Sequence, residues 1–182
     1  PTREWDTALK DGRVYSYFPP MFTILAAAVA PFCEGIQHGL IVAMVFLVPI
    51  CAYVLFLRLT GSACWGAILA IGLVCGTSAL AVIDKTVRGA APYQINHTLS
   101  TIGLLLILID FFGRRRIWPA CIGLVLTTLS RQLTVAYALP IAMMSLGGAP
   151  PQERWRRLTV VGLTCVGLAV FYGGLNFLKF GH

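Results

Sequence analysis

Two aspartates near the start of the chain are the residues best suited to proton transfer. Asp6 and Asp11 lie in the longest polar segment, Trp5–Pro20 (WDTALKDGRVYSYFPP), whose aromatic side chains include Tyr15 and Tyr17. An ionised carboxylate can act as a general base when it lies within hydrogen-bond reach of the proton that it removes. The aspartates also suit the role of solvated loop acids, and the tyrosines suit the aromatic belt at a membrane surface. The segment therefore indicates catalysis or binding, with a purely interfacial loop as the alternative.

Arg131 is the strongest candidate for an anion contact, because apolar sequence flanks it on both sides. A charge at membrane depth is costly, and such residues usually face protein or a polar cavity. We favour a lipid phosphate or a carboxylate as its partner over an arginine that merely extends to the headgroups. His97 has two interpretations: a polar residue packed at a helix start, which is the commoner case, or a ligand to substrate or phosphate. The candidate binding set is completed by Asn96, Lys85 and Arg88.

Composition shows which elements must position these residues. Hydrophobic residues make up 58% of the 182 residues and charged residues 12%, about half the charged fraction of a soluble domain. The chain is therefore expected to be an all-α, polytopic transmembrane bundle forming one domain over residues 1–182. The net charge of +7 lies in short loops, which favours membrane lipid as a partner and not nucleic acid.

The six cysteines are scattered and form no CxxC pair, so we expect them to pack between helices and not to form disulfides or bind a metal. No cluster with metal-ligand spacing is present in the sequence, and no cofactor is assigned, although a divalent metal is left open.

Apolar runs predict about six membrane-spanning segments behind an outer-face loop over residues 1–20. Met21–Phe32 rises only about 18 Å as a helix, less than a hydrocarbon core of about 30 Å, and is expected to be a juxtamembrane helix. Gly72 and Gly76 form a small-xxx-small step, typical of close helix packing. The transmembrane region is expected over residues 40–178, in the runs Leu40–Leu57, Ser62–Ile83, Ile95–Phe112, Ile117–Ser130, Gln132–Leu146 and Leu158–Leu178.

The densest basic loops set the predicted orientation. Lys and Arg are enriched in cytoplasmic loops, and the two densest clusters are residues 114–116 and the arginines at 154, 156 and 157. Placing both inside also puts Arg58 inside, while the N-terminal segment, the loop at 84–94 and Arg131 lie outside. The polar candidates then gather at the outer end of the bundle. Within the last apolar turn of its run, Asp110 is expected to pair with Arg114 one helical turn away.

Four stretches resemble a known family. The opening segment with its short apolar helix resembles the first outer loop of polyprenyl-phosphate-sugar-dependent glycosyltransferases with the C-type (GT-C) fold, akin to protein mannosyltransferases and aminoarabinose transferases. YQINHTLSTIGLLLILIDFFGRRR resembles the mid-bundle helix of that family, GLVLTTLSRQLTVAYALP its Arg-containing hairpin, and LNFLKFGH the step that closes its final helix.

The resemblance implies a reaction and roles for individual residues. An acid of the first outer loop, here Asp6 or secondarily Asp11, would deprotonate an acceptor hydroxyl that attacks a lipid-phosphate sugar, and Arg131 would contact the phosphate. Tyr15 and Tyr17 would line the sugar or lipid site. The family's acid often follows a first transmembrane helix that this sequence lacks, so we expect a fragment of a longer protein.

A second class of function is also consistent with the sequence. A transporter or flippase-like carrier of an anionic lipid or solute is the alternative, although no internal repeat typical of carriers is evident. The expected location is a bacterial inner membrane, with the site facing the periplasm or the outside, and the endoplasmic reticulum is the alternative. The sequence indicates neither the sugar and acceptor nor the oligomeric state.

Overall fold

The computed structural model describes residues 7–10, 13–16, 20–32, 36–77, 79–87, 92–113, 116–144 and 150–180. Within these ranges the chain is helical apart from one short hairpin, which confirms the predicted helical class. The elements are β1 (Thr7–Lys10), β2 (Arg13–Ser16), α1 (Met21–Val29), η1 (Ala30–Phe32), α2 (Ile36–Thr60), α3 (Ala63–Gly76), α4 (Ala79–Val87), α5 (Pro92–Phe111), α6 (Ile117–Ser130), η2 (Gln132–Thr134), α7 (Val135–Met144) and α8 (Pro151–Phe180).

Among the described residues, three helices are long and apolar enough to cross a membrane. These stretches are Gly39–Thr60 of α2, Gln94–Phe111 of α5 and Pro151–Leu178 of α8. Such helices are typical of an integral membrane protein, as the composition predicted. The predicted count of six spans is not confirmed, because α3, α6 and α7 are apolar but shorter. The 14 residues of α6, for example, rise only about 21 Å against a hydrocarbon core of about 30 Å.

The run predicted as one helix over Ser62–Ile83 is divided into α3 and α4 at Thr77. This residue has an extended backbone, with φ −122° and ψ 177°. Its hydroxyl donates to the Leu73 carbonyl at 2.6 Å and accepts from the Ala79 N–H at 3.2 Å. Threonine competes with helical hydrogen bonding in this way, and here it both ends α3 and caps α4. An apolar run therefore did not guarantee one continuous helix.

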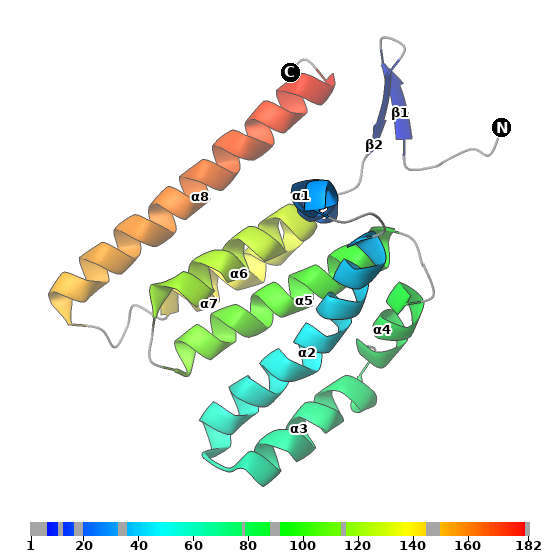
Figure 1. Cartoon of the computed structure of the whole chain (residues 1–182). Coiled ribbons are helices and arrows are strands. Elements are labelled where there is room, and N and C mark those ends of the chain that lie inside the picture. Colours follow the sequence, from blue (N-terminus) through cyan, green and yellow to red (C-terminus); the bar gives the residue numbers. More distant parts are fainter. Residues whose placement is uncertain are drawn as a thin grey trace.

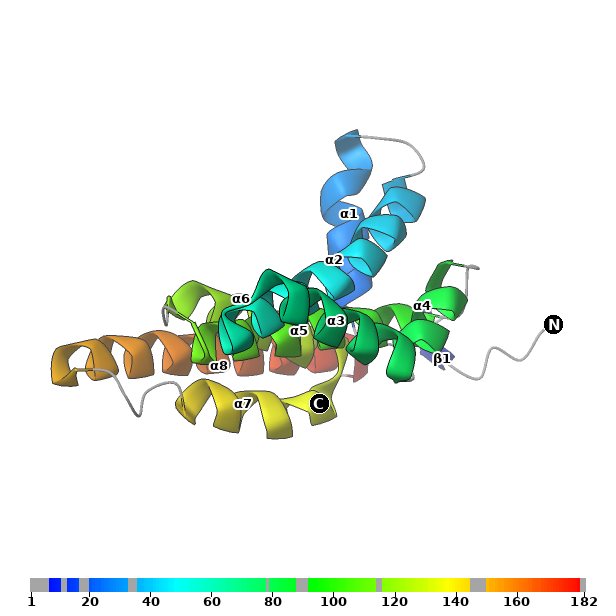
Figure 2. The same cartoon turned by 90° about the horizontal axis from the view of Figure 1, so that it is seen from below.

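Helix α5 is the centre of the bundle. Of its apolar stretch 61% is buried, against 33% for α2 and 6% for α8, and it packs against α1, α2, α4, α6 and α7. Figure 2 shows α7 on one side of α5 and α6, with α1 and the first turns of α2 on the other. The core is therefore built around α5, and α8 runs along the edge with most of its surface uncovered.

Glycines let α5 and α6 approach backbone to backbone. A Cβ added at Gly103 would lie 2.7 Å from the Gly123 carbonyl oxygen, and one added at Gly123 would lie 2.5 Å from the Gly103 carbonyl oxygen. A side chain at either position would therefore collide with the backbone of the other helix. The predicted packing pair, Gly72 and Gly76, is wrong for the described residues, since nothing there lies within 4 Å of either added Cβ. The close helix contact is made by Gly103 and Gly123, and not by the Gly72–Gly76 step that the spacing of small residues predicted.

The bundle has two distinct ends (Figure 1). Helices α2, α5 and α7 run in one direction, while α3, α6 and α8 run in the other. We call the end where α6 finishes the Arg131 end and the end where α2 finishes the Arg58 end. The β1–β2 hairpin, α1 and the close of α8 lie toward the Arg131 end.

The opening segment contains a β-hairpin where the sequence predicted a loop. β1 and β2 are antiparallel, with Thr7 opposite Ser16 and Lys10 opposite Arg13. The two residues between the strands are Asp11 and Gly12, and Asp-Gly is among the dipeptides most favoured in two-residue hairpin loops. That dipeptide was a usable signal in the sequence.

Candidate functional site

Arg131 lies in the turn that reverses the chain between α6 and α7. Its backbone is extended, with φ −160° and ψ 106°, and its N–H donates to the Thr127 carbonyl, which ends α6. Its own carbonyl accepts from the Thr134 N–H at 3.0 Å and so begins η2. This local geometry places the arginine side chain at the tip of the α6–α7 hairpin.

The guanidinium group of Arg131 contacts His97 of α5, with Nη1 3.1 Å from Nδ1. Arginine has only N–H donors, so the imidazole must accept this hydrogen bond through an unprotonated Nδ1. His97 is therefore neutral in this geometry, with its ring proton on Nε2. A neutral acceptor orients the guanidinium group, and a guanidinium group is well suited to bind phosphate.

Other polar side chains lie in the neighbouring turns of α5, α6 and η2, and several of their atoms are buried. Ser100 donates to Thr134 at 3.0 Å, which joins α5 to η2. Three buried atoms have no hydrogen-bond partner among the described residues: Gln94 Oε1, Asn96 Oδ1 and Ser130 Oγ. Each unsatisfied buried group costs about 1–3 kcal/mol. Such groups are rare in folded proteins and mark places where water or a ligand completes the bonding.

The predicted site residues are only partly described. Asn96, His97 and Arg131 all lie at the Arg131 end, with Asn96 buried beside the half-buried His97. Tyr15 is paired with Ala8 in the hairpin and Lys85 lies in α4, but the structure does not describe either side chain. Asp6, Asp11, Tyr17 and Arg88 lie outside the described residues. The contact between His97 and Arg131 is thus the described part of the predicted site.

Comparisons with family models, with curated proteins and with solved structures found no match for this chain. The resemblance to GT-C glycosyltransferases therefore remains a prediction that rests on the quoted motifs. Among the described residues, no group of three or more His, Cys, Asp or Glu side chains could hold a metal ion.

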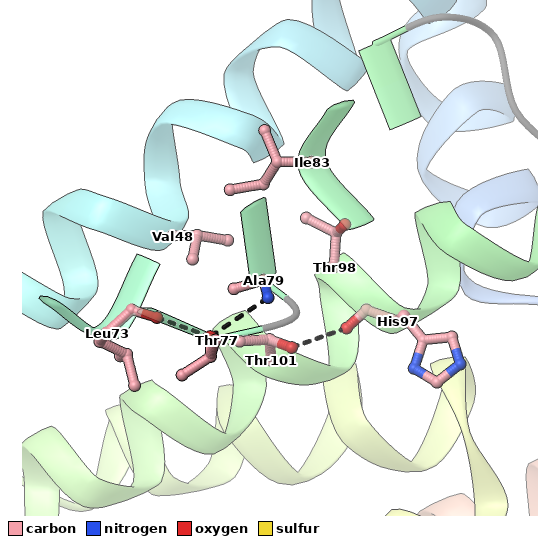
Figure 3. Close-up of a pocket in the computed structure, with 8 residues that line it drawn as sticks. All are labelled: Val48, Leu73, Thr77, Ala79, Ile83, His97, Thr98 and Thr101. Atoms are coloured by element: carbon pink, nitrogen blue, oxygen red, sulfur yellow. Dashed lines mark hydrogen bonds between the residues drawn. The ribbon is translucent and has the colours of Figure 1, made fainter. Parts of the chain in front are cut away.

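A cavity of about 230 Å³ lies beside the first turns of α5, between α2, α3 and α4. The side chains of Val48, Leu73 and Ile83 make much of its wall apolar (Figure 3). The hydroxyls of Thr98 and Thr101 donate back to carbonyls one turn earlier in α5, so their donors are already used. The His97 imidazole points away from this cavity. His97 nevertheless lines the cavity as well as contacting Arg131, so the two features lie side by side.

A second polar group, which the sequence did not predict as such, lies at the Arg58 end. Asp110 is 1% exposed, and its Oδ2 lies 3.7 Å from Nη1 of Arg157 in α8. Arg157 also bonds Glu153 through Nε and Nη2, at 3.3 and 3.2 Å. The predicted partner, Arg114, lies outside the described residues. The sequence did contain a signal for this pair: an acid inside an apolar run, such as Asp110, needs a cation as its partner when it is buried.

Proposed function

We propose that this chain is the membrane part of a glycosyltransferase that moves a sugar from a polyprenyl-phosphate donor to an acceptor hydroxyl. The observation that carries the proposal is the Arg131 guanidinium, held by the neutral His97 at one end of an apolar bundle. A lipid-linked donor presents a phosphate and a sugar at the membrane surface, directly above its hydrocarbon chain. A positioned cation at that level is the group such a donor needs.

In the proposed reaction the acceptor oxygen attacks the anomeric carbon of the sugar. The bond between that carbon and the phosphate oxygen breaks, and its electron pair leaves with the polyprenyl phosphate. Arg131 stabilises the negative charge that develops on the phosphate, and Asp6 receives the acceptor proton. Asp11 is the second choice for this base. Tyr15, Tyr17, Lys85, Arg88 and Asn96 complete the proposed binding set for sugar and phosphate.

The proposal includes an orientation and a membrane count. The Arg131 end faces the periplasm of a bacterial inner membrane, because the basic residues at 58, 116, 154 and 156 lie at the other end. The short helices α3, α6 and α7 lie within the bilayer beside α2, α5 and α8, which gives six membrane segments. The short helices reach part of the bilayer depth, so the Arg131 turn lies below the level of the longest helix ends.

The test is sugar transfer in membranes that contain the natural protein. Radiolabelled polyprenyl-phosphate sugars are supplied to wild type, Asp6→Asn, Asp11→Asn and Arg131→Ala, and label in an acceptor is measured. We expect transfer to fall at least about 100-fold in Arg131→Ala, since removing one stabiliser of developing charge costs about 2.7–4 kcal/mol. Asp6→Asn should fall by a comparable factor or more.

The matched control is Arg156→Ala, which removes the same charge at an exposed position of α8. This variant should keep wild-type transfer. Full transfer by both Asp6→Asn and Arg131→Ala, at equal protein levels, would contradict the site assignment. Absence of transfer with every donor, together with movement of an anionic lipid across liposomes by the purified protein, would favour the carrier instead.

A further inference from the structure

A cavity of about 560 Å³ opens at the Arg58 end, between α2, α5 and the start of α6. Its size falls within the range of about 300–1,000 Å³ that is usual for small-molecule sites. Arg58, in the last turn of α2, and Arg116, directly before α6, both line it. Ile50, Val54 and Leu106 supply apolar wall. The cavity therefore joins two cations to a hydrocarbon surface.

Both arginines have donors to offer a ligand. Arg116 makes no hydrogen bond or ion pair with the described residues, and it directly precedes the 14-residue helix α6. Arg58 donates through Nη1 to the Ile109 carbonyl at 2.7 Å, which uses one of the five N–H groups of a guanidinium. Gly113 leaves the space that the Arg58 guanidinium occupies, because an added Cβ would overlap it.

The acid in the cavity wall does not cancel these charges. Asp110 also lines the cavity, but its Oδ2 lies 3.7 Å from Nη1 of Arg157, which bonds Glu153 as well. Counted together, these groups carry three positive charges and two negative ones: Arg58, Arg116 and Arg157 against Asp110 and Glu153. The positive end of the α6 dipole adds to the attraction for an anion.

The cavity also lies at the level expected for lipid headgroups. Arg58 belongs to the last turn of α2, one of the helices long enough to cross a membrane. Trp118, in the cavity wall, is 55% exposed, and tryptophan is enriched at the membrane–water interface. Basic pockets between membrane helices bind the headgroups of anionic lipids.

We propose that this cavity binds the phosphate of an anionic phospholipid, with Arg58 and Arg116 as its ligands and an acyl chain along Ile50, Val54 and Leu106. The site lies at the opposite end of the bundle from Arg131, so it does not depend on the proposed glycosyl transfer. The lipid would connect α2, α5 and α6 at the end where α8 joins the bundle through Arg157.

The test measures lipid retention by native mass spectrometry. The purified protein in neutral detergent is titrated with phosphatidylglycerol and, separately, with phosphatidylcholine. We expect tighter retention of phosphatidylglycerol. Since a basic residue near an anionic lipid surface contributes about 1 kcal/mol, Arg116→Gln should weaken it about fivefold and Arg58→Gln/Arg116→Gln about 25-fold. Arg116→Gln breaks no hydrogen bond among the described residues, so it tests the site even if Arg58→Gln fails to fold.

The matched control is Arg156→Gln, which makes the same charge change on an exposed residue of α8 that does not line the cavity. It should change retention less than twofold. Wild-type retention by Arg116→Gln, or an equal loss in Arg156→Gln, would overturn the proposal. Inorganic phosphate at millimolar concentration should not displace the lipid. If it does so completely, the cavity is a free-phosphate site and the lipid assignment is wrong.

Discussion

At the scale of single residues, Arg131 and His97 have different roles: Arg131 carries the charge, and His97 orients the Arg131 side chain. Arg131 supplies the charge, and His97 supplies an acceptor that is neutral because its partner has only donors. A carboxylate in the place of His97 would have held the arginine more tightly but would also have neutralised it. The pair thus suits an arginine that must still bind an anion.

A double-mutant cycle tests this division of roles. His97→Ala should lower sugar transfer about tenfold, because it frees the Arg131 side chain without removing its charge, whereas Arg131→Ala should lower it at least about 100-fold. In the Arg131→Ala background, His97→Ala should have no further effect, since coupled residues are not additive. The initial rate of transfer is the measurement. Independent, multiplying losses would show that His97 acts on the substrate and not through Arg131.

At the scale of helices, the position of the candidate site depends on how closely α5 and α6 pack. His97 is on α5 and Arg131 follows α6, so their contact requires the backbone approach at Gly103 and Gly123. Helix α8 is attached differently, through Arg157 to Asp110 and through the Tyr172 hydroxyl to the Thr128 carbonyl at 2.9 Å. An apolar core thus holds the centre, and the edge helix joins it through buried Val161 and Leu168 as well as through these polar contacts.

The sequence predicted the helices better than it predicted their contacts. Composition and apolar runs indicated the membrane helices, because hydrophobicity is a property of each segment alone. The break at Thr77 was missed because a short local hydrogen-bond pattern outweighed an apolar run. The Gly103–Gly123 contact and the Asp110–Arg157 pair were missed because each joins residues far apart in the chain. The hairpin has a local signal, the dipeptide Asp11-Gly12 between its two strands.

Alanine substitutions test the packing assignment. Gly103→Ala should destabilise the bundle by about 1–3 kcal/mol, because the new methyl group meets the Gly123 carbonyl and Thr127. Gly72→Ala should be neutral or stabilise by up to about 1 kcal/mol, since it adds helix propensity in open space. Thermal unfolding in detergent, followed by circular dichroism, measures both. A Gly72→Ala protein less stable than Gly103→Ala would reverse the assignment.

At the scale of the whole molecule, the two ends differ in chemistry. At the Arg131 end, Arg131 is grouped with histidine, amide and hydroxyl groups, and Lys10, Arg13 and Lys179 belong to elements that lie toward the same end, whereas the Arg58 end carries Arg58, Arg116 and the arginine cluster at the start of α8. Since basic residues concentrate on the cytoplasmic side, this asymmetry predicts how the bundle sits in the membrane. It also separates a site for a substrate at one surface from a lipid site at the other.

Cysteine labelling tests this orientation. In a background where the six natural cysteines are replaced by serine or alanine, one cysteine is placed at Leu133 or at Arg156. Both residues are exposed, Leu133 at the Arg131 end and Arg156 at the Arg58 end. A membrane-impermeant maleimide added to spheroplasts should label Leu133→Cys directly and Arg156→Cys only after permeabilisation. The reverse pattern would place the Arg131 end in the cytoplasm, where the proposed transfer would have to draw its donor from the inner leaflet. Labelling of both cysteines without permeabilisation would mean that the two ends lie on one side, and the bundle would not cross the bilayer as its helix lengths predict.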